Sequence, residues 1–160
     1  MSITDVKVFL NEAFKDERGE LWTIWNEAEF EPKLKFNHDK IAVSKKNVLR
    51  GIHGDSKSWK LITCLSGEIK LVVVDPKTLQ HMSILLTNKN KLSVLVPPGF
   101  GNGHLVLSDE AVFYYKWAYE GEYPDVEDQF SLRWDDPKLK IDWGITNPIL
   151  SKRDKNAKML

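Results

Sequence analysis

The chain has 160 residues, of which 42% are hydrophobic and 29% charged, the proportions of a globular domain. Its 23 basic and 23 acidic residues cancel, which argues against a nucleic-acid partner or charge-driven binding to a membrane surface. A single cysteine, Cys64, excludes an intrachain disulfide. The N-terminus lacks the apolar core of a signal peptide, and no apolar run reaches transmembrane length. We therefore expect one domain spanning 1–160, located in the cytoplasm.

Short β-rich runs recur along the chain between turn signals, which favours an all-β sandwich or barrel. The first two runs, 6–10 and 21–25, flank a turn at 16–19. Residues 61–65 and 69–74 are separated by Ser66-Gly67-Glu68, which predicts a tight hairpin. The other predicted strands are 36–44, 48–53, 81–87, 92–96, 104–107 and 111–117.

The last predicted strand is aromatic, whereas the segment after it is rich in residues typical of loops. Alternation along the strand places Phe113, Tyr115 and Trp117 on one face. From 134 to 148 the chain is rich in Pro, Asp and Trp, so we expect loops and short helical turns that wrap around the barrel.

His53, Asp55, Lys60 and Gly67 have the spacing of the first metal-binding motif of the cupin jelly roll, and Asn102 stands where the second motif has its His. A metal cupin needs a second His at position 55 and a carboxylate at position 60. A Lys ammonium cannot ligate a cation. We therefore expect a cupin barrel with no metal and no other cofactor. His53 and Lys60 would point into it, a pair suited to removing a proton and stabilising the resulting anion.

Seven short segments occur in a fixed order along the chain: Asp16-x-Arg18-Gly19, 48–53, 98–100, 106–109, 115–116, 134–137 and 149–154. Together they resemble the dTDP-4-dehydrorhamnose 3,5-epimerase family, metal-free cupins that act on nucleotide-linked 4-keto sugars. The resemblance extends over residues 6–154, nearly the whole chain. Each segment alone is weak evidence, whereas the ordered set is specific.

The resemblance implies a set of catalytic residues. The 4-keto group acidifies the protons on C3 and C5, and His53 is implied as the base that removes one, with Asp154 as its carboxylate partner. Lys60 opens the apolar run 61–65, which predicts that its side chain projects beside His53 and stabilises the enolate. Tyr115 is implied as the acid that returns a proton on the opposite face of the sugar.

The resemblance also implies substrate-binding residues. Arg18 and Arg50 match phosphate-contacting arginines of the family, and Arg153 takes the place of a Lys in the same role. The sequence Arg50-Gly51-Ile52-His53 is typical of the family, which places Arg50 three residues before the implied base.

Three residues depart from the family pattern around the sugar: Asp55, Asn102 and His104. Gly54 and Gly103 remove side-chain bulk beside them, which predicts a wider and more polar pocket. The same pattern resembles relatives that act on GDP-linked 4-keto-heptoses for capsule or lipopolysaccharide synthesis. We therefore expect these three residues to bind a larger sugar, with the nucleotide and the inverted carbon, C3 or C5 or both, left open.

The sequence leaves three further functions open. A sugar-nucleotide 3,4-ketoisomerase shares the fold but carries a second His where this chain has Asp55. A metal cupin oxygenase or isomerase is the second, and a non-catalytic sugar-nucleotide-binding cupin is the third.

The N-terminal region bears on oligomeric state. Residues 6–25 exceed what one small jelly roll needs. Together with the resemblance, this extra length implies a homodimer that exchanges strands through this region.

Overall fold

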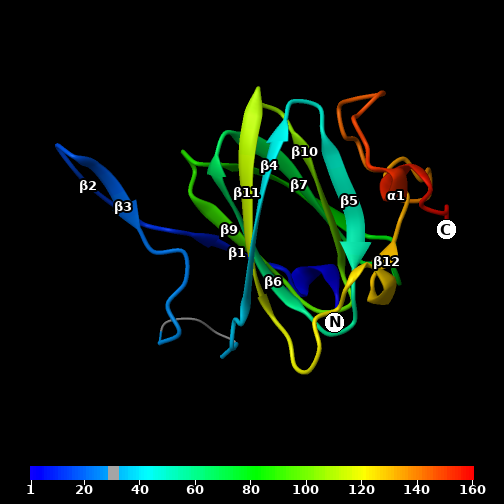
Figure 1. Cartoon of the computed structure of the whole chain (residues 1–160), viewed down its shortest axis with the longest axis horizontal. Coiled ribbons are helices and arrows are strands. Elements are labelled where there is room, and N and C mark those ends of the chain that lie inside the picture. Colours follow the sequence, from blue (N-terminus) through cyan, green and yellow to red (C-terminus); the bar gives the residue numbers. More distant parts are fainter. Residues whose placement is uncertain (29–32) are drawn as a thin grey trace.

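The structure is a computed structural model that describes residues 1–28 and 33–160. It is built from two five-stranded antiparallel sheets that face each other as a barrel (Figure 1). In order across the first sheet lie β1 (Lys7–Leu10), β9 (Leu92–Val96), β6 (Trp59–Ser66), β11 (Glu110–Ala118) and β4 (His38–Lys45). The second sheet contains β12 (Phe130–Ser131), β5 (Leu49–Gly54), β10 (Gly101–Val106), β7 (Glu68–Val74) and β8 (His81–Thr87).

A separate hairpin of β2 (Ala13–Asp16) and β3 (Gly19–Trp22) projects from the barrel, as the blue arm of Figure 1 shows. The described helical elements are short: η1 (Ile3–Asp5), η2 (Val126–Asp128) and α1 (Lys152–Lys155). The predicted all-β barrel with N-terminal strands and an irregular C-terminal wrap is confirmed.

The main core fills the space between the two sheets. Alternation along each strand sends every second side chain inward, and the buried members of this core are aliphatic or aromatic apart from Cys64. Its fully buried members include Ile62, Ile69, Leu71, Val73 and Val94. The cavity inside the barrel borders this core, since Phe113 belongs to both.

The outer face of the second sheet is also covered. The C-terminal wrap buries Leu132, Leu139 and Trp143 against the second sheet. It is tied down by polar contacts as well, since Trp143 Nε1 donates to the carbonyl of Trp134 at 2.8 Å. Leu49 on β5 donates its backbone N–H to the carbonyl of Ile149 at 3.0 Å. These contacts bring the chain end beside β5, which carries His53.

The predicted hairpin across Ser66-Gly67-Glu68 is wrong. Strand β6 pairs with β9 and β11, whereas β7 pairs with β8 and β10, so this connection passes from one sheet to the other. Gly67 has a φ of 78°, and a Cβ there would collide with the carbonyl of Glu110. Both kinds of connection need a tight glycine turn, so the local sequence does not distinguish them.

The N-terminal prediction also needs correction. The turn at 16–19 joins β2 and β3, not the runs 6–10 and 21–25. The first run forms β1, which pairs with β9 at the edge of the first sheet. Within 1–28 and 33–160, no helix is long and apolar enough to cross a membrane.

Candidate functional site

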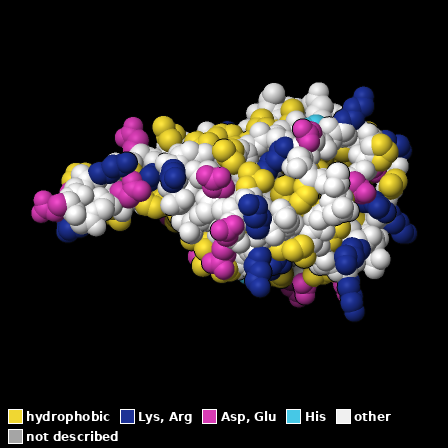
Figure 2. All heavy atoms as spheres, turned by 90° about the horizontal axis from the view of Figure 1, so that it is seen from above, with side chains coloured by type: hydrophobic (Ala, Val, Ile, Leu, Met, Phe, Trp, Pro, Cys, Tyr) yellow, Lys and Arg dark blue, Asp and Glu magenta, His cyan; other side chains and the backbone are white. Residues whose placement is uncertain are grey.

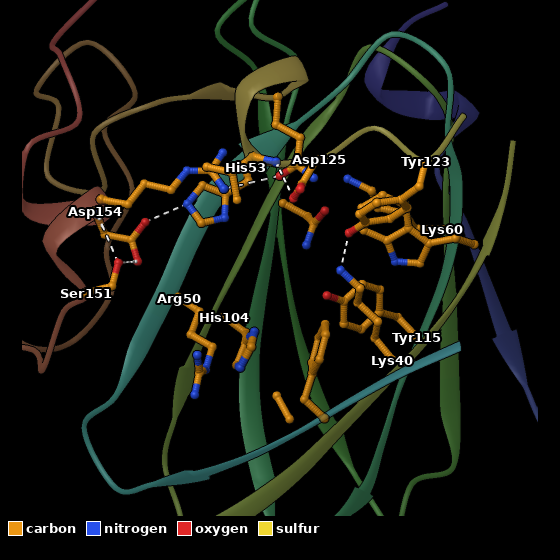
Figure 3. Close-up of a pocket in the computed structure, with 17 residues that line it drawn as sticks. Lys40, Arg50, His53, Lys60, His104, Tyr115, Tyr123, Asp125, Ser151 and Asp154 are labelled. Atoms are coloured by element: carbon orange, nitrogen blue, oxygen red, sulfur yellow. Dashed lines mark hydrogen bonds and ion pairs between the residues drawn. The ribbon is translucent and has the colours of Figure 1, made fainter. Parts of the chain in front are cut away.

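A cavity of about 250 Å³ lies between the two sheets. Its walls come from β4, β5, β6, β10 and β11, and from the segments around Tyr123 and Ser151 (Figure 3). The lining is unusually charged for a barrel interior, with two histidines and six charged side chains: Lys40, Arg50, Lys60, Asp125, Arg153 and Asp154.

His53 is paired with Asp154 across the edge of this cavity. His53 Nε2 lies 2.5 Å from Asp154 Oδ1, and the carboxylate is nearly buried while the imidazole is 24% exposed. Ser151 caps the N-terminus of α1 and donates its hydroxyl to the other carboxylate oxygen at 2.8 Å. Burial raises the pKa of Asp154, but the hydrogen bond and charge of His53 outweigh it and hold this pKa below its usual value. The carboxylate therefore stays ionised and orients the ring.

Lys60 stands on β6 with its ammonium inside the barrel. The side chain is 5% exposed, and Nζ lies 3.3 Å from Asp55 Oδ2 and 4.5 Å from the ring centroid of Trp117. Burial lowers the pKa of Lys60, and the charge of Asp55 opposes that effect. The expectation that Lys60 faces the same space as His53 is met, since both line the cavity.

Tyr115 occupies the opposite wall from His53, on β11. Its ring lies between Phe113 at 4.9 Å and Trp117 at 5.5 Å, which confirms that the three aromatic residues share one face. Burial raises the pKa of Tyr115 to about 12, with a smaller contribution from Tyr123. The phenol therefore keeps its proton at neutral pH and is available as a donor.

Arg50 and Arg153 bring positive charge into the cavity and are held by neutral partners. Arg50 Nε donates to Ser44 Oγ at 3.0 Å. Arg153 Nε donates to Ser131 Oγ at 2.9 Å, and its Nη1 donates to Gln129 at 3.3 Å. Among the residues the structure describes, neither guanidinium forms an ion pair with a carboxylate. Their charge is thus uncompensated and available to an anionic ligand.

Buried polar atoms without partners are concentrated at this site. Native proteins leave few such atoms, and each one needs an explanation. In the described part of the chain, three of the six belong to residues that line the cavity: His104 Nε2, Trp117 Nε1 and Arg153 Nη2. Two more lie in the turn behind Lys60: the Ser58 hydroxyl, and Asp55 Oδ2, which accepts no hydrogen bond from the described residues but has the Lys60 ammonium as its ion-pair partner. The cavity is therefore arranged for a polar ligand.

Asp55 does not have the position that the sequence predicted. It is 3% exposed and does not line the cavity. Its Oδ1 accepts the backbone N–H groups of Lys57 and Ser58 at 2.9 and 2.6 Å, and Oδ2 faces Lys60. A carboxylate used in this way closes a turn and fixes Lys60, so it is not free for a substrate hydroxyl.

The glycines do not widen the cavity either. A Cβ on Gly54 would meet Phe130 and the carbonyl of Phe100, and one on Gly103 would meet Ile52 and the carbonyl of Arg50. Both glycines therefore allow backbones and side chains to pack closely within the second sheet. Asn102 and His104, by contrast, do line the cavity as predicted.

Arg18 lies outside the site of its own chain. It sits at the tip of the projecting hairpin, where its side chain is 84% exposed and forms an ion pair with Asp16. Figure 2 shows this arm standing clear of the barrel. Within one chain, Arg18 therefore cannot contact a ligand bound beside His53.

Lys40 lines the cavity but was not predicted from the sequence. Lys40 is the cross-strand neighbour of Tyr115, donates a hydrogen bond to the Tyr123 hydroxyl, and stands 4.3 Å from the ring centroid of Tyr123 (Figure 3). A signal was present in β4, where His38, Lys40 and Ala42 alternate with Asp39 and apolar residues. This alternation is easily overlooked, because it points Lys40 inward and the apolar residues Ile41 and Val43 outward.

The side chains do not fit a metal-cupin centre. His53, Asp55, Lys60 and Asn102 occupy the four ligand positions, and two of these pair with each other. In the residues that the structure describes, no group of three or more His, Cys, Asp or Glu side chains is placed to hold a metal ion.

A family model and a curated relative both match this chain over nearly its whole length. Residues 1–160 match the family model described as dTDP-4-dehydrorhamnose 3,5-epimerase. The enzyme of that name from Shigella flexneri is 35% identical over 167 residues, covering 97% of this chain and 91% of that protein.

Two solved structures are similar over nearly their whole length and confirm the predicted cupin fold. The dTDP-6-deoxy-D-glucose-3,5-epimerase of Legionella pneumophila, in complex with dTDP-4-keto-L-rhamnose, has a TM-score of 0.90 and 33% identity, covering 99% of this chain and 89% of that one. The dTDP-4-dehydrorhamnose 3,5-epimerase of Bacillus anthracis, with TDP and PPi bound, has a TM-score of 0.92 and 28% identity, covering 100% and 97%.

Proposed function

The chain belongs to the dTDP-4-dehydrorhamnose 3,5-epimerase family, and from this premise we propose how its own residues carry out the reaction. It is an isomerase that epimerises dTDP-linked 4-keto-6-deoxy sugars at C3 and/or C5. The observation that carries the assignment of roles is the His53–Asp154 pair on one wall, facing Tyr115 on the other with the Lys60 ammonium in the same cavity.

His53 is the base in this proposal. A neutral imidazole takes the proton from a carbon next to the 4-keto group, and the ring becomes an imidazolium. Asp154 then stabilises that cation through the hydrogen bond it already makes to Nε2. Removal of the proton leaves the electron pair delocalised onto the C4 oxygen as an enolate.

Lys60 stabilises this enolate. Its ammonium is buried, so its charge acts on the C4 oxygen with little screening by water. The pairing with Asp55 holds Nζ in place, which avoids reorganisation as the negative charge develops. Tyr115 then gives its proton to the same carbon from the opposite face. Before the next turnover the imidazolium of His53 loses its proton to solvent and the phenolate of Tyr115 takes one from solvent.

Arg50 and Arg153 bind the diphosphate. Both guanidinium groups are positioned by neutral hydrogen-bond partners, and Arg153 Nη2 is buried without one. A phosphate oxygen would supply the missing acceptor and the opposite charge. Arg18 could join them only from a second copy of the chain.

The assignment of the base is tested by hydrogen exchange. The protein is incubated with dTDP-4-keto-6-deoxyglucose in deuterated water, and incorporation at C3 and C5 is followed by NMR. We expect wash-in by the wild type and a rate loss of about 10²–10⁴-fold in His53→Asn, the usual contribution of a general base. Deuterium wash-in by the variant at the wild-type rate would exclude His53 as the base. The carbon that gains deuterium in the wild-type reaction would identify the inverted centre.

We also propose that the preferred sugar is a 4-keto-heptose, used for surface polysaccharide. Of the residues behind this choice, only Asn102 and His104 line the cavity, and the amide of Asn102 is the group assigned to the additional hydroxyl, because Asp55 faces Lys60 instead. A site that hydrogen-bonds an additional hydroxyl discriminates against a substrate that lacks it. Competition between GDP-4-keto-heptose and dTDP-4-keto-6-deoxyglucose tests the proposal, and a clear preference for the dTDP-hexose would reject it.

A further inference from the structure

His104 places a polar ring where the cavity meets the hydrophobic core. The residue is 3% exposed, lies on β10 and lines the cavity beside Ala42 and Arg50. Its ring stacks on Phe113 with centroids 4.1 Å apart and planes 9° apart. Figure 3 shows His104 between Arg50 and the wall that carries Lys40 and Tyr115.

The imidazole of His104 is buried without the hydrogen bond that such burial requires. Its Nε2 has no partner among the residues that the structure describes. A buried donor or acceptor left unpaired destabilises the folded protein, because the group has lost its hydrogen bonds to water. The stacking on Phe113 does not explain the choice of residue, because a Phe in its place would stack equally well and would leave no unpaired polar atom.

The ring is also uncharged. Burial lowers the pKa of His104 to about 3, and the nearby charges of Arg50 and His53 act in the same direction. A neutral imidazole has one N–H donor and one acceptor nitrogen, which suits a hydroxyl, since that group can both give and take a hydrogen bond. It is poorly suited to a phosphate, whose charge Arg50 and Arg153 already match.

We propose that His104 is a specificity-determining residue that hydrogen-bonds a hydroxyl of the sugar, and that it does not contact the diphosphate. This inference rests on the proposed function for the identity of the site, and it adds a residue that contacts the sugar part of the substrate. In the free protein Nε2 is closed off from solvent and has no hydrogen-bond partner among the described residues, so it would pair with a substrate hydroxyl once the ring turns towards the cavity that it lines. Asn102, two residues earlier on β10, lines the same cavity and extends this neutral polar surface.

The test is equilibrium binding in a background that cannot turn over. Calorimetry on His53→Asn and on His53→Asn/His104→Phe would measure the dissociation constants of dTDP and of dTDP-4-keto-6-deoxyglucose. We expect the added substitution to weaken binding of the sugar nucleotide about 10–100-fold, as for loss of one buried hydrogen bond, and to change dTDP binding less than about twofold. His104→Gln, which keeps hydrogen-bonding capacity, should recover part of the loss.

Thermal unfolding of the ligand-free proteins provides a second readout. Because His104→Phe removes an unpaired buried polar atom and keeps the stacking, its Tm should equal or exceed that of the wild type. His81→Phe, on β8 and away from the cavity, is the matched control and should not alter either dissociation constant.

Equal weakening of dTDP and the sugar nucleotide would overturn the proposal and assign His104 to the phosphates. No change in either dissociation constant would show that the ring serves packing alone. Failure of the proposed function would instead appear as absence of deuterium wash-in by the wild type. That result leaves the binding comparison intact, so the two failures are distinguishable.

Discussion

At the scale of single residues, Tyr115 illustrates how burial sets a chemical role. Three aromatic rings follow one another along the inner face of β11, and only the middle one carries a hydroxyl. Burial raises its pKa to about 12, which keeps the phenol protonated across the physiological range. The same burial destabilises the charged phenolate, so Tyr115 regains a proton readily after it has donated one.

Tyr115→Phe should separate exchange from inversion. The base can still remove a proton and return it to the same face, so deuterium wash-in is expected to persist. Epimerised product should fall by about 10²-fold or more, because the acid on the opposite face is lost. NMR of one reaction mixture measures both quantities, and inversion at the wild-type rate would mean that another group or water is the acid.

His104 gives a pH prediction for stability. Its ordinary pKa of 6.5 applies to the unfolded chain, whereas burial, with Arg50 and His53, lowers the folded value to about 3. Between these values only the unfolded chain binds the proton, so the free energy of unfolding decreases as pH falls, by up to about 1.4 kcal/mol per pH unit.

His104→Phe should remove that slope. Urea unfolding of wild type and variant between about pH 7 and about pH 4.5 would measure the difference in free energy, which should grow in favour of the variant as pH decreases. Asp154 also loses stability in acid, because its folded pKa is lowered, but it is present in both proteins and cancels. A difference independent of pH would contradict the neutral, buried state of His104.

At the scale of elements, β4 has an inverted pattern. Its polar residues His38, Lys40 and Ser44 point inward, and Ile41 and Val43 are 62% and 56% exposed. In an ordinary barrel strand the apolar residues would point inward. The inversion allows one strand to line the cavity with its polar face while leaving an apolar face outside.

Lys40→Met tests what the inner face of β4 does for the cavity wall around Tyr123. The change removes the hydrogen bond to the Tyr123 hydroxyl and a cation–π contact of about 0.5–2 kcal/mol. We expect faster backbone hydrogen exchange in 119–129, a KM raised several-fold and a smaller effect on kcat. Lys45→Met, exposed on the same strand, is the control and should change unfolding free energy by less than about 0.5 kcal/mol. Unchanged exchange in 119–129 would contradict this role.

At the scale of the whole molecule, the projecting hairpin needs a partner surface. Phe14 and Leu21 on its strands are 69% and 74% exposed, and Leu10 beside it is 70% exposed. A two-stranded ribbon has little stability alone. We therefore keep the prediction of a homodimer, in which the arm of one copy packs on the other and carries Arg18 towards its site.

Phe14→Asp/Leu21→Asp should convert that dimer to an 18.5 kDa monomer without unfolding the barrel, because neither side chain belongs to its core. Sedimentation would measure the mass, and Glu17→Lys, at the hairpin turn, is the control. A wild type that sediments only as a monomer at micromolar concentration would reject the dimer. If the dimer forms, the double variant should also bind dTDP more weakly, since Arg18 is withdrawn.

The sequence by itself determined the β-rich elements and, through the spacing from His53 to Lys60, two residues of the cavity. These are local properties, because alternation, turn residues and motif spacing act over a few positions. Arg50 and Tyr115 were identified through the resemblance to the family and not through a local pattern.

Only the tertiary structure decided which strands pair and what surrounds each charge. The turn at Gly67 serves a hairpin or a sheet-to-sheet connection equally well, and here β6 and β7 pair with other strands in two separate sheets. Asp55 has the spacing of a site residue, yet its carboxylate faces the turn and Lys60. Asp154 meets His53 from 101 residues away, because the C-terminal wrap packs on the outer face of the second sheet. Such long-range contacts depend on the packing of whole elements, which no local pattern records.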